Sequence, residues 1–324
     1  MKLASILALS LITLPVAAHH GVAGIGVAGL NGPGAPIESA ASTVLPEGKA
    51  LAYFKVDHAN YRTYDWAQPN ADYSRYTMLG LGYGFTPWFS AYACLPYNQK
   101  IDEAGGQDSR GFADISIMGQ IGFKYDKGLM LIPENESLDD LEDWHFSVFG
   151  GASLPTGDAN HRLDDGSIDP GKSPGFGRPS YSLGLTASKM LSERLTLSLE
   201  ASTLRFLEYR YDDGQTMRFG AETRLNTAVS YRGWTVPERL FRLDPVVELQ
   251  YLSLGRDKAD GVYEAGTGGQ MIYLLPGVRA YWQSMSFAFG IKTPIWTDLN
   301  ESDQQQGAEG KERYRLIFSA SMLF

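Results

Sequence analysis

Charged side chains of both signs recur at alternate positions in short segments whose intervening residues are apolar. Lys55 and Asp57 form one such pair, and Glu222 and Arg224 form another. Successive side chains of a β-strand point to opposite faces, so each pair shares one face while apolar residues cover the other. If the apolar face meets lipid, the charged face lines the interior of a membrane barrel. The predicted lumen-lining residues are Lys55, Asp57, Asp114, Lys124, Glu200, Glu222, Arg224, Glu248, Arg279, Lys292, Arg313 and Arg315.

Two interpretations of these charges remain open. The groups either pair across a largely filled interior, which is a structural role, or line a small aqueous path. Barrels of about eight strands are filled with side chains and those of sixteen or more leave channels, so about twelve strands lies between these limits. We predict a channel for passive passage of small solutes or hydrophobic compounds, with a structural barrel lacking an open pore as the alternative.

His145 and Ser147 could form a nucleophilic pair, because they lie two apart on one face of a predicted strand. Their spacing resembles the His-x-Ser motif of outer-membrane phospholipase, a twelve-stranded barrel whose hydroxyl is activated by imidazole. The Asn that follows the serine in that enzyme is replaced here by Val148. We therefore predict that the protein is not an enzyme and keep an outer-membrane lipid hydrolase as a minor alternative.

The amino terminus carries a second chemical signal. Residues 1–18 have a basic start at Lys2, an apolar run and a small-residue ending at Ala18, which is the pattern of a secretory signal peptide. Cleavage there would expose the α-amine of His19 beside His20, and these donors together could bind Cu(II). A copper-associated barrel is accordingly another alternative, and no other cofactor is predicted.

Composition excludes several other classes. The net charge of −9 and the pI near 5.1 exclude nucleic acid as a partner, because phosphate binding needs a basic surface. Cys94 is the only cysteine, so the chain cannot form an internal disulfide. The acidic loop around Asp164 and Asp165 matches no calcium-binding spacing and is interpreted as solvated.

Twelve segments with a period of two must position these residues. No stretch after residue 18 reaches the roughly 18 apolar residues of a membrane helix, whereas short alternating segments are typical of a transmembrane β-barrel. The fold class is therefore all-β, an antiparallel up-and-down barrel of about twelve strands. The predicted strands are residues 49–58, 75–85, 89–97, 112–124, 144–154, 180–191, 194–204, 217–231, 245–254, 270–282, 286–296 and 314–324.

The connections and the carboxyl terminus place this barrel in the bacterial outer membrane. Short and long connections alternate along the chain, as do the periplasmic turns and external loops of such barrels, and residues 125–143 are the one long connection at a periplasmic end. The last strand ends in Phe324, which resembles the signal read by the barrel-assembly machinery. The expected partners are this machinery, outer-membrane lipid and a small-molecule solute.

A Gly/Ala-rich segment without periodicity, residues 19–47, separates the signal peptide from the barrel at residues 48–324. It contains Gly32-Pro33-Gly34 and lacks the pattern of a strand or a helix. We interpret it as an irregular extension on the periplasmic side or within the lumen.

The barrel portion also resembles a known family. The run from Leu79 to Ser90, reading LGLGYGFTPWFS, continues into Leu95-Pro96-Tyr97; the motifs Gly111-Phe112-Ala113-Asp114-Ile115 and Leu154-Pro155-Thr156-Gly157-Asp158 follow. These residues are similar to those of the outer-membrane "transporter" family linked to the meta-pathway of phenol degradation. The resemblance implies a membrane barrel and suggests an aromatic cargo, and its motifs mark turns and strand starts rather than a reactive centre.

Overall fold

The computed structural model describes residues 34–61, 73–101, 108–134, 136, 141–302, 305 and 310–324. The signal peptide, His19 and His20 therefore lie outside the described residues. None of the described helical residues forms a helix with the length and hydropathy needed to cross a membrane.

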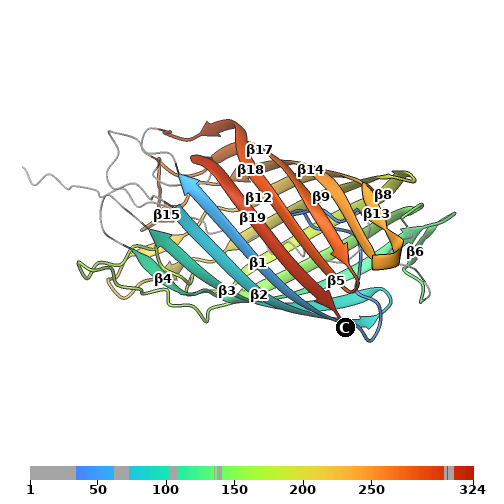
Figure 1. The fold of residues 1–324 in the computed structure, drawn as a ribbon. Coiled ribbons are helices and arrows are strands. Elements are labelled where there is room, and N and C mark those ends of the chain that lie inside the picture. Colours follow the sequence, from blue (N-terminus) through green and yellow to red (C-terminus); the bar gives the residue numbers. More distant parts are fainter. Residues whose placement is uncertain are drawn as a thin grey trace, which may run out of the picture.

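Within these residues, twelve long strands form one closed antiparallel ring (Figure 1). Each strand pairs with its neighbours along the chain, and β1 pairs with β19 to close the ring. The predicted all-β barrel of about twelve strands is confirmed. The strands are β1 (Ala50–Tyr61), β2 (Tyr73–Thr86), β3 (Phe89–Ile101), β5 (Ile115–Tyr125), β7 (Trp144–Leu154), β8 (Ser180–Ser192), β9 (Leu195–Phe206), β12 (Glu222–Tyr231), β14 (Phe241–Leu254), β17 (Gly269–Trp282), β18 (Met285–Leu299) and β19 (Glu312–Leu323).

Exposure alternates along these strands. Outward-pointing Leu81 is 68% exposed and Leu185 is 56% exposed, while inward-pointing neighbours such as Thr186 are buried. An apolar surface that encircles a whole protein far exceeds the few hundred Å² that a soluble monomer shows. The outer wall therefore fits lipid. Tyr181 and Trp296 are exposed near strand ends, where amphipathic rings meet the lipid–water boundary.

Short elements extend the wall at both ends. On the periplasmic side, β6 (Leu129–Leu131) pairs with β5, and β13 (Trp234–Val236) leads through the 3-10 turn η1 (Pro237–Arg239) into β14. On the external side, β4 (Ser109–Phe112) pairs with β3. A separate small sheet there comprises β10 (Tyr209–Arg210), β11 (Thr216–Arg218), β15 (Lys258–Ala259) and β16 (Val262–Tyr263).

Two predicted strands are divided in the structure. The predicted strand 112–124 is interrupted at Ala113 and Asp114, between β4 and β5. The predicted strand 217–231 is interrupted before β12, because β11 joins the small external sheet rather than the ring. Phe219 consequently packs against Phe206 and Phe176 in an external apolar cluster instead of facing lipid.

Candidate functional site in the barrel lumen

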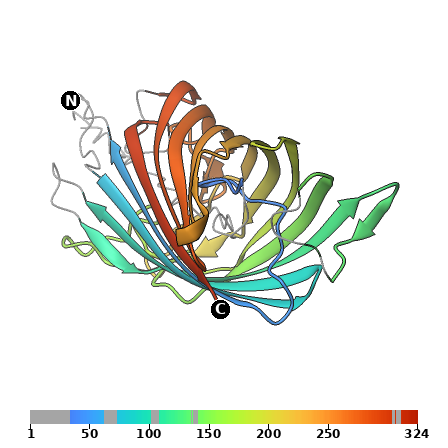
Figure 2. The ribbon, with the colours of Figure 1, turned by 45° about the vertical axis from the view of Figure 1, so that its right-hand side comes forward.

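Residues 34–47 run through the inside of the barrel before the chain enters β1, and Figure 2 shows this blue segment crossing the interior. Ile37, Ser42 and Leu45 in it are at most 1% exposed. The segment forms no regular secondary structure. Its backbone polar groups therefore need partners from the barrel wall, since unpaired buried amides are costly.

Two carboxylates of the wall supply much of this pairing. Glu248 of β14, fully buried, accepts hydrogen bonds from the backbone N–H groups of Ile37, Glu38 (2.9 Å) and Ser39 (3.0 Å). Glu200 of β9 accepts the N–H of Ala40 at 2.7 Å. Hydrogen bonds to ionised acceptors are roughly twice as strong as neutral ones, so these carboxylates fix the path of the segment.

Further wall residues bind the segment through neutral or cationic donors. Arg279 of β17 donates to the carbonyl oxygen of Pro36. Gln120 of β5 donates to the carbonyl oxygen of Ala41 at 2.9 Å. On β8, the hydroxyl of Thr186 lies 2.9 Å from that of Ser42. The side chains on both sides of the lumen therefore hold the segment.

A buried group of charged residues, which we term the inner ionic cluster, lies beside Glu38. The Lys292 ammonium donates to Glu38 Oε2 at 2.9 Å, and the Lys55 ammonium lies 3.8 Å from Glu38 Oε1. Lys55 also lies 3.9 Å from Asp57. The full cluster comprises Glu38, Lys55, Asp57, Lys292, Glu312 and Arg315, with Arg315 bonded to Glu312 and 3.6 Å from Asp57.

Glycines on the inner wall make room for the segment. A Cβ added at Gly84 of β2 would lie 2.1 Å from the carbonyl oxygen of Pro46. A Cβ at Gly277 of β17 would lie 2.4 Å from Cδ1 of Ile37. Real Cβ atoms essentially never approach other atoms this closely. The segment's backbone therefore requires glycine at position 84. At position 277 a Cβ would also lie 2.3 Å from the carbonyl oxygen of Phe289, so the wall itself requires glycine there.

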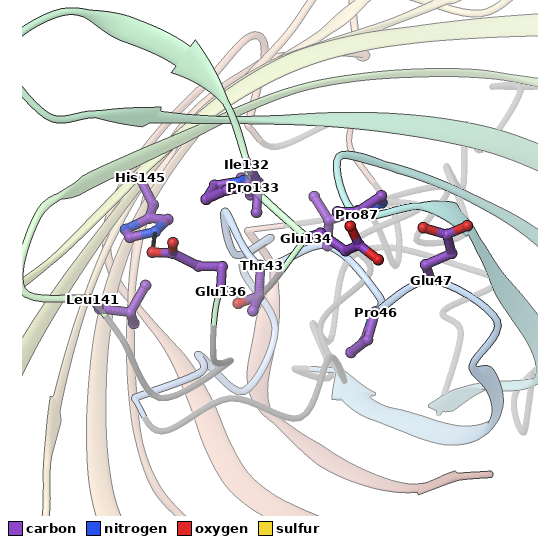
Figure 3. Close-up of a pocket in the computed structure, with 11 residues that line it drawn as sticks. Thr43, Pro46, Glu47, Pro87, Ile132, Pro133, Glu134, Glu136, Leu141 and His145 are labelled. Carbon is purple, nitrogen blue, oxygen red and sulfur yellow. Dashed lines mark hydrogen bonds and ion pairs between the residues drawn. The ribbon is translucent and has the colours of Figure 1, made fainter.

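The segment leaves the lumen at the periplasmic end beside a small pocket (Figure 3). The segment contributes four of the residues that line the pocket, Thr43, Val44, Pro46 and Glu47. The barrel and its connections contribute the others, which are Pro87, Ile132, Pro133, Glu134, Glu136, Leu141 and His145. Its volume of about 40 Å³ suits one or two water molecules but no larger solute.

His145 and Ser147 point into the lumen but do not form a nucleophilic pair. His145 Nε2 lies 3.0 Å from Glu136, and Nδ1 lies 3.1 Å from the carbonyl oxygen of Asp143. The Ser147 hydroxyl instead contacts Thr186 at 2.6 Å and Gln120. Within the part of the chain that the structure describes, no imidazole is placed to take the serine proton.

Four of the remaining predicted lumen residues occupy three other places. Lys124 forms an ion pair with Glu136 at 2.7 Å near the periplasmic end. Glu222 and Arg224 pair with each other at 2.6 Å on β12. Asp114 lies at the interruption between β4 and β5, where its carboxylate accepts backbone N–H groups of an external loop.

The prediction for Arg313 is wrong, because this side chain is exposed. The pairing of β1 with β19 shifts register there, so that Asn60 faces Tyr314 while Tyr61 faces Glu312. A β-bulge of this kind re-aims the side chains beside it. Glu312 therefore takes the buried inner position, where it binds Arg315.

Sequence reasoning missed Glu38, Ser39 and Glu312. The first two belong to a segment without periodicity, so nothing in their spacing indicated contact with the wall. A carboxylate embedded in an apolar stretch, as Glu38 is between Ile37 and Ala40, was the one available signal. Among the described residues, no group of three or more His, Cys, Asp or Glu side chains is arranged to hold a metal ion.

A closed barrel with an apolar outer wall and a charged inner wall defines an outer-membrane β-barrel of the porin-like transporter class. Within this class, residues 41–309 match the family described as "Putative MetA-pathway of phenol degradation", and the chain belongs to that family. The resemblance predicted from the sequence motifs is confirmed.

One solved structure agrees with this fold. The chain is similar to the COG4313 outer membrane channel from Pseudomonas putida F1, with a TM-score of 0.66 and 13% identity over 87% of this chain and 98% of that one. It also matches the NanC porin, with a TM-score of 0.45 and 10% identity over 84% and 98% of the two chains. No curated protein matches the sequence.

Proposed function

We propose that the protein is an outer-membrane channel whose lumen passes small solutes, and that residues 34–47 control this passage. The observation that carries the proposal is the binding of a whole chain segment by wall residues such as Glu248 and Arg279. A barrel whose own side chains filled its interior would leave no room for such a segment. Displacement of the segment would therefore open a polar path.

The inner wall also favours a solute with an aromatic ring as one candidate cargo. Tyr53 and Cys94 pack with Met78 and Tyr76 on the inner faces of β1, β2 and β3. Rings and sulfur atoms form favourable contacts with aromatic molecules, and the family description names phenol degradation.

Assembly and location complete the proposal. We propose that residues 1–18 direct export, and that the barrel-assembly machinery reads the last strand. Phe324 at its end is 57% exposed, and its N–H donates to the carbonyl oxygen of Ala50 at 2.8 Å. The aromatic ring is thus available to a partner while the backbone is fixed to β1.

Conductance of single molecules in planar bilayers tests the channel function. Glu248→Gln replaces an acceptor of three N–H groups with a neutral amide and should raise the conductance several-fold. Glu222→Gln is the matched control, because Glu222 is a buried wall carboxylate paired with Arg224. The structural alternative, a barrel without an open pore, predicts no conductance in either variant, and that result would refute the proposal.

A further inference from the structure

The wall part of the inner ionic cluster carries an excess positive charge. Counted as formal charges, Lys55, Lys292 and Arg315 contribute three cations, and Asp57 and Glu312 contribute two anions, which leaves one positive charge. All five residues are at most 3% exposed. An uncompensated buried charge is strongly unfavourable. The wall therefore requires one anionic group at the position of the Glu38 carboxylate.

Groups that recognise a peptide backbone lie next to this position. Glu248 accepts consecutive N–H groups of Ile37, Glu38 and Ser39, and its Oε2 also accepts the Ser39 hydroxyl at 2.5 Å. Arg279 donates to the carbonyl oxygen of Pro36. The carboxylate accepts hydrogen bonds from backbone N–H groups, and the guanidinium donates one to a backbone carbonyl. Together they recognise the peptide backbone, whatever its side chains are.

An apolar site completes the arrangement. Ile37 is fully buried in a cluster with Val246, Leu275, Ala288 and Ile317, which are inner-wall residues of β14, β17, β18 and β19. Gly290 on β18 would carry a Cβ within 3.3 Å of Ile37, so the wall is shaped around a branched side chain. Burial of such a side chain contributes about 1.5–3 kcal/mol.

We propose that the wall around Ile37, Glu38 and Ser39 is a binding site for short acidic peptides, which the chain's own segment occupies in the closed protein. The ligand carries an apolar residue, then a carboxylate residue, then a hydroxyl residue. This inference rests on the proposed function, since a peptide reaches the site only through the lumen. Such a peptide competes with residues 34–47 and thereby favours the open path.

Calorimetric titration of the full-length protein in detergent tests the site directly. The probe is the acetylated and amidated peptide Pro-Ile-Glu-Ser-Ala, and the control peptide has Gln in place of Glu. The receptor is the triple variant Ile37→Ala, Glu38→Gln, Ser39→Ala. These substitutions weaken the binding of the segment to the wall and leave the sequence of every strand unchanged. Heat-modifiable migration on gels verifies that its barrel is folded. Glu38→Gln alone serves as a second, milder receptor.

The triple variant should bind the probe at least tenfold more tightly than the native protein, and the Gln peptide at least tenfold more weakly than the probe. Adding Lys292→Met should abolish the preference for Glu over Gln. Adding Lys124→Met should preserve that preference, because Lys124 pairs with Glu136 outside the cluster.

Equal affinity for the two peptides, or no binding to either folded receptor, would overturn the inference. Binding without any bilayer conductance would refute the channel proposal and leave the peptide site standing.

Discussion

Ser39 and Glu248 lie 209 residues apart in the chain, yet one carboxylate oxygen of Glu248 accepts both the N–H of Ser39 at 3.0 Å and its hydroxyl at 2.5 Å. A hydrogen bond to a charged group contributes about 1.5–3 kcal/mol to a folded arrangement. A few such contacts hold residues 34–47 in place. Their total stabilising free energy is far smaller than that of the closed ring of strands. We therefore expect the segment to leave the lumen while the barrel stays folded.

Gly84→Ala should displace the end of the segment that leads into β1, because the added Cβ would meet the carbonyl oxygens of Pro46 at 2.1 Å and Leu45 at 2.6 Å. Release would expose Glu38, which is 8% exposed in the structure, to a glutamate-specific protease. We expect cleavage after Glu38 at least ten times faster than in the native protein. Gly128→Ala is the control, because nothing lies within 4 Å of a Cβ there; equal cleavage of the two variants would contradict the prediction.

Depth in the membrane should determine the cost of a charge on the outer wall. Leu185 lies near the middle of β8 and is 56% exposed to lipid, whereas Tyr181 lies at the external end of that strand and is 51% exposed. Leu185→Arg should lower the free energy of unfolding by about 2–4 kcal/mol, and Tyr181→Arg by about 0–1 kcal/mol. Urea titration in lipid vesicles measures both values, and similar losses would show that the outer face is assigned incorrectly.

Asp114 should act as the anchor of the external loop between β7 and β8. Its carboxylate accepts the N–H of Gly157 at 2.9 Å and that of Phe176 at 3.0 Å, which joins the two ends of this loop. Asp114→Asn should loosen the loop at a cost of about 1–3 kcal/mol. Tryptic cleavage at buried Lys172 reports the change.

The matched control for this loop is Asp158→Asn, because Asp158 is an exposed carboxylate whose side-chain partners, the N–H of Asn160 and the His161 ring at 3.8 Å, belong to the same loop. Trypsin should cleave the Asp158→Asn protein at Lys172 as fast as it cleaves the native protein. Unchanged cleavage in Asp114→Asn would show that the loop is held by its apolar contacts alone.

The processed amino terminus should bind Cu(II). Cleavage after Ala18 would place the free α-amine of His19 beside two imidazoles, and all of these donors are available to the metal near neutral pH. Titration of the processed protein should show one equivalent of bound copper, and an extra residue before His19 should weaken binding at least tenfold. A processed protein that takes up no copper would leave both histidines as ordinary terminal residues.

The barrel could be predicted from the sequence because lipid imposes a strict period of two on each strand. The predicted strand 144–154 coincides with β7 at both ends, since His145 and Ser147 alternate there with apolar residues. The same rule placed Lys55 and Asp57 on the inner face, where both are buried. It failed at Arg313, because a bulge changes the facing of residues without any change in the apolar pattern.

The contents of the lumen could not be predicted in this way. The path of residues 34–47 depends on partners far away in the chain, such as Glu248 and Gln120, and on glycines such as Gly84 that only the closed ring brings together. The segment itself is poor in charged residues and has no period. Sequence reasoning therefore identified the wall charges and left residues 19–47 either on the periplasmic side or within the lumen, but it predicted no contact between the two.

A reversible cross-link between the segment and the wall tests the central claim most directly. The hydroxyl oxygens of Ser42 and Thr186 lie 2.9 Å apart, so Ser42→Cys and Thr186→Cys in a Cys94→Ser background should form a disulfide. Ser147→Cys with Thr186→Cys is the control, because their hydroxyls lie 2.6 Å apart but both belong to the wall. Bilayer conductance of the first pair should be low when oxidised and rise several-fold on reduction, while the control pair shows no redox dependence. Conductance of the first pair that is unchanged by reduction would contradict the account.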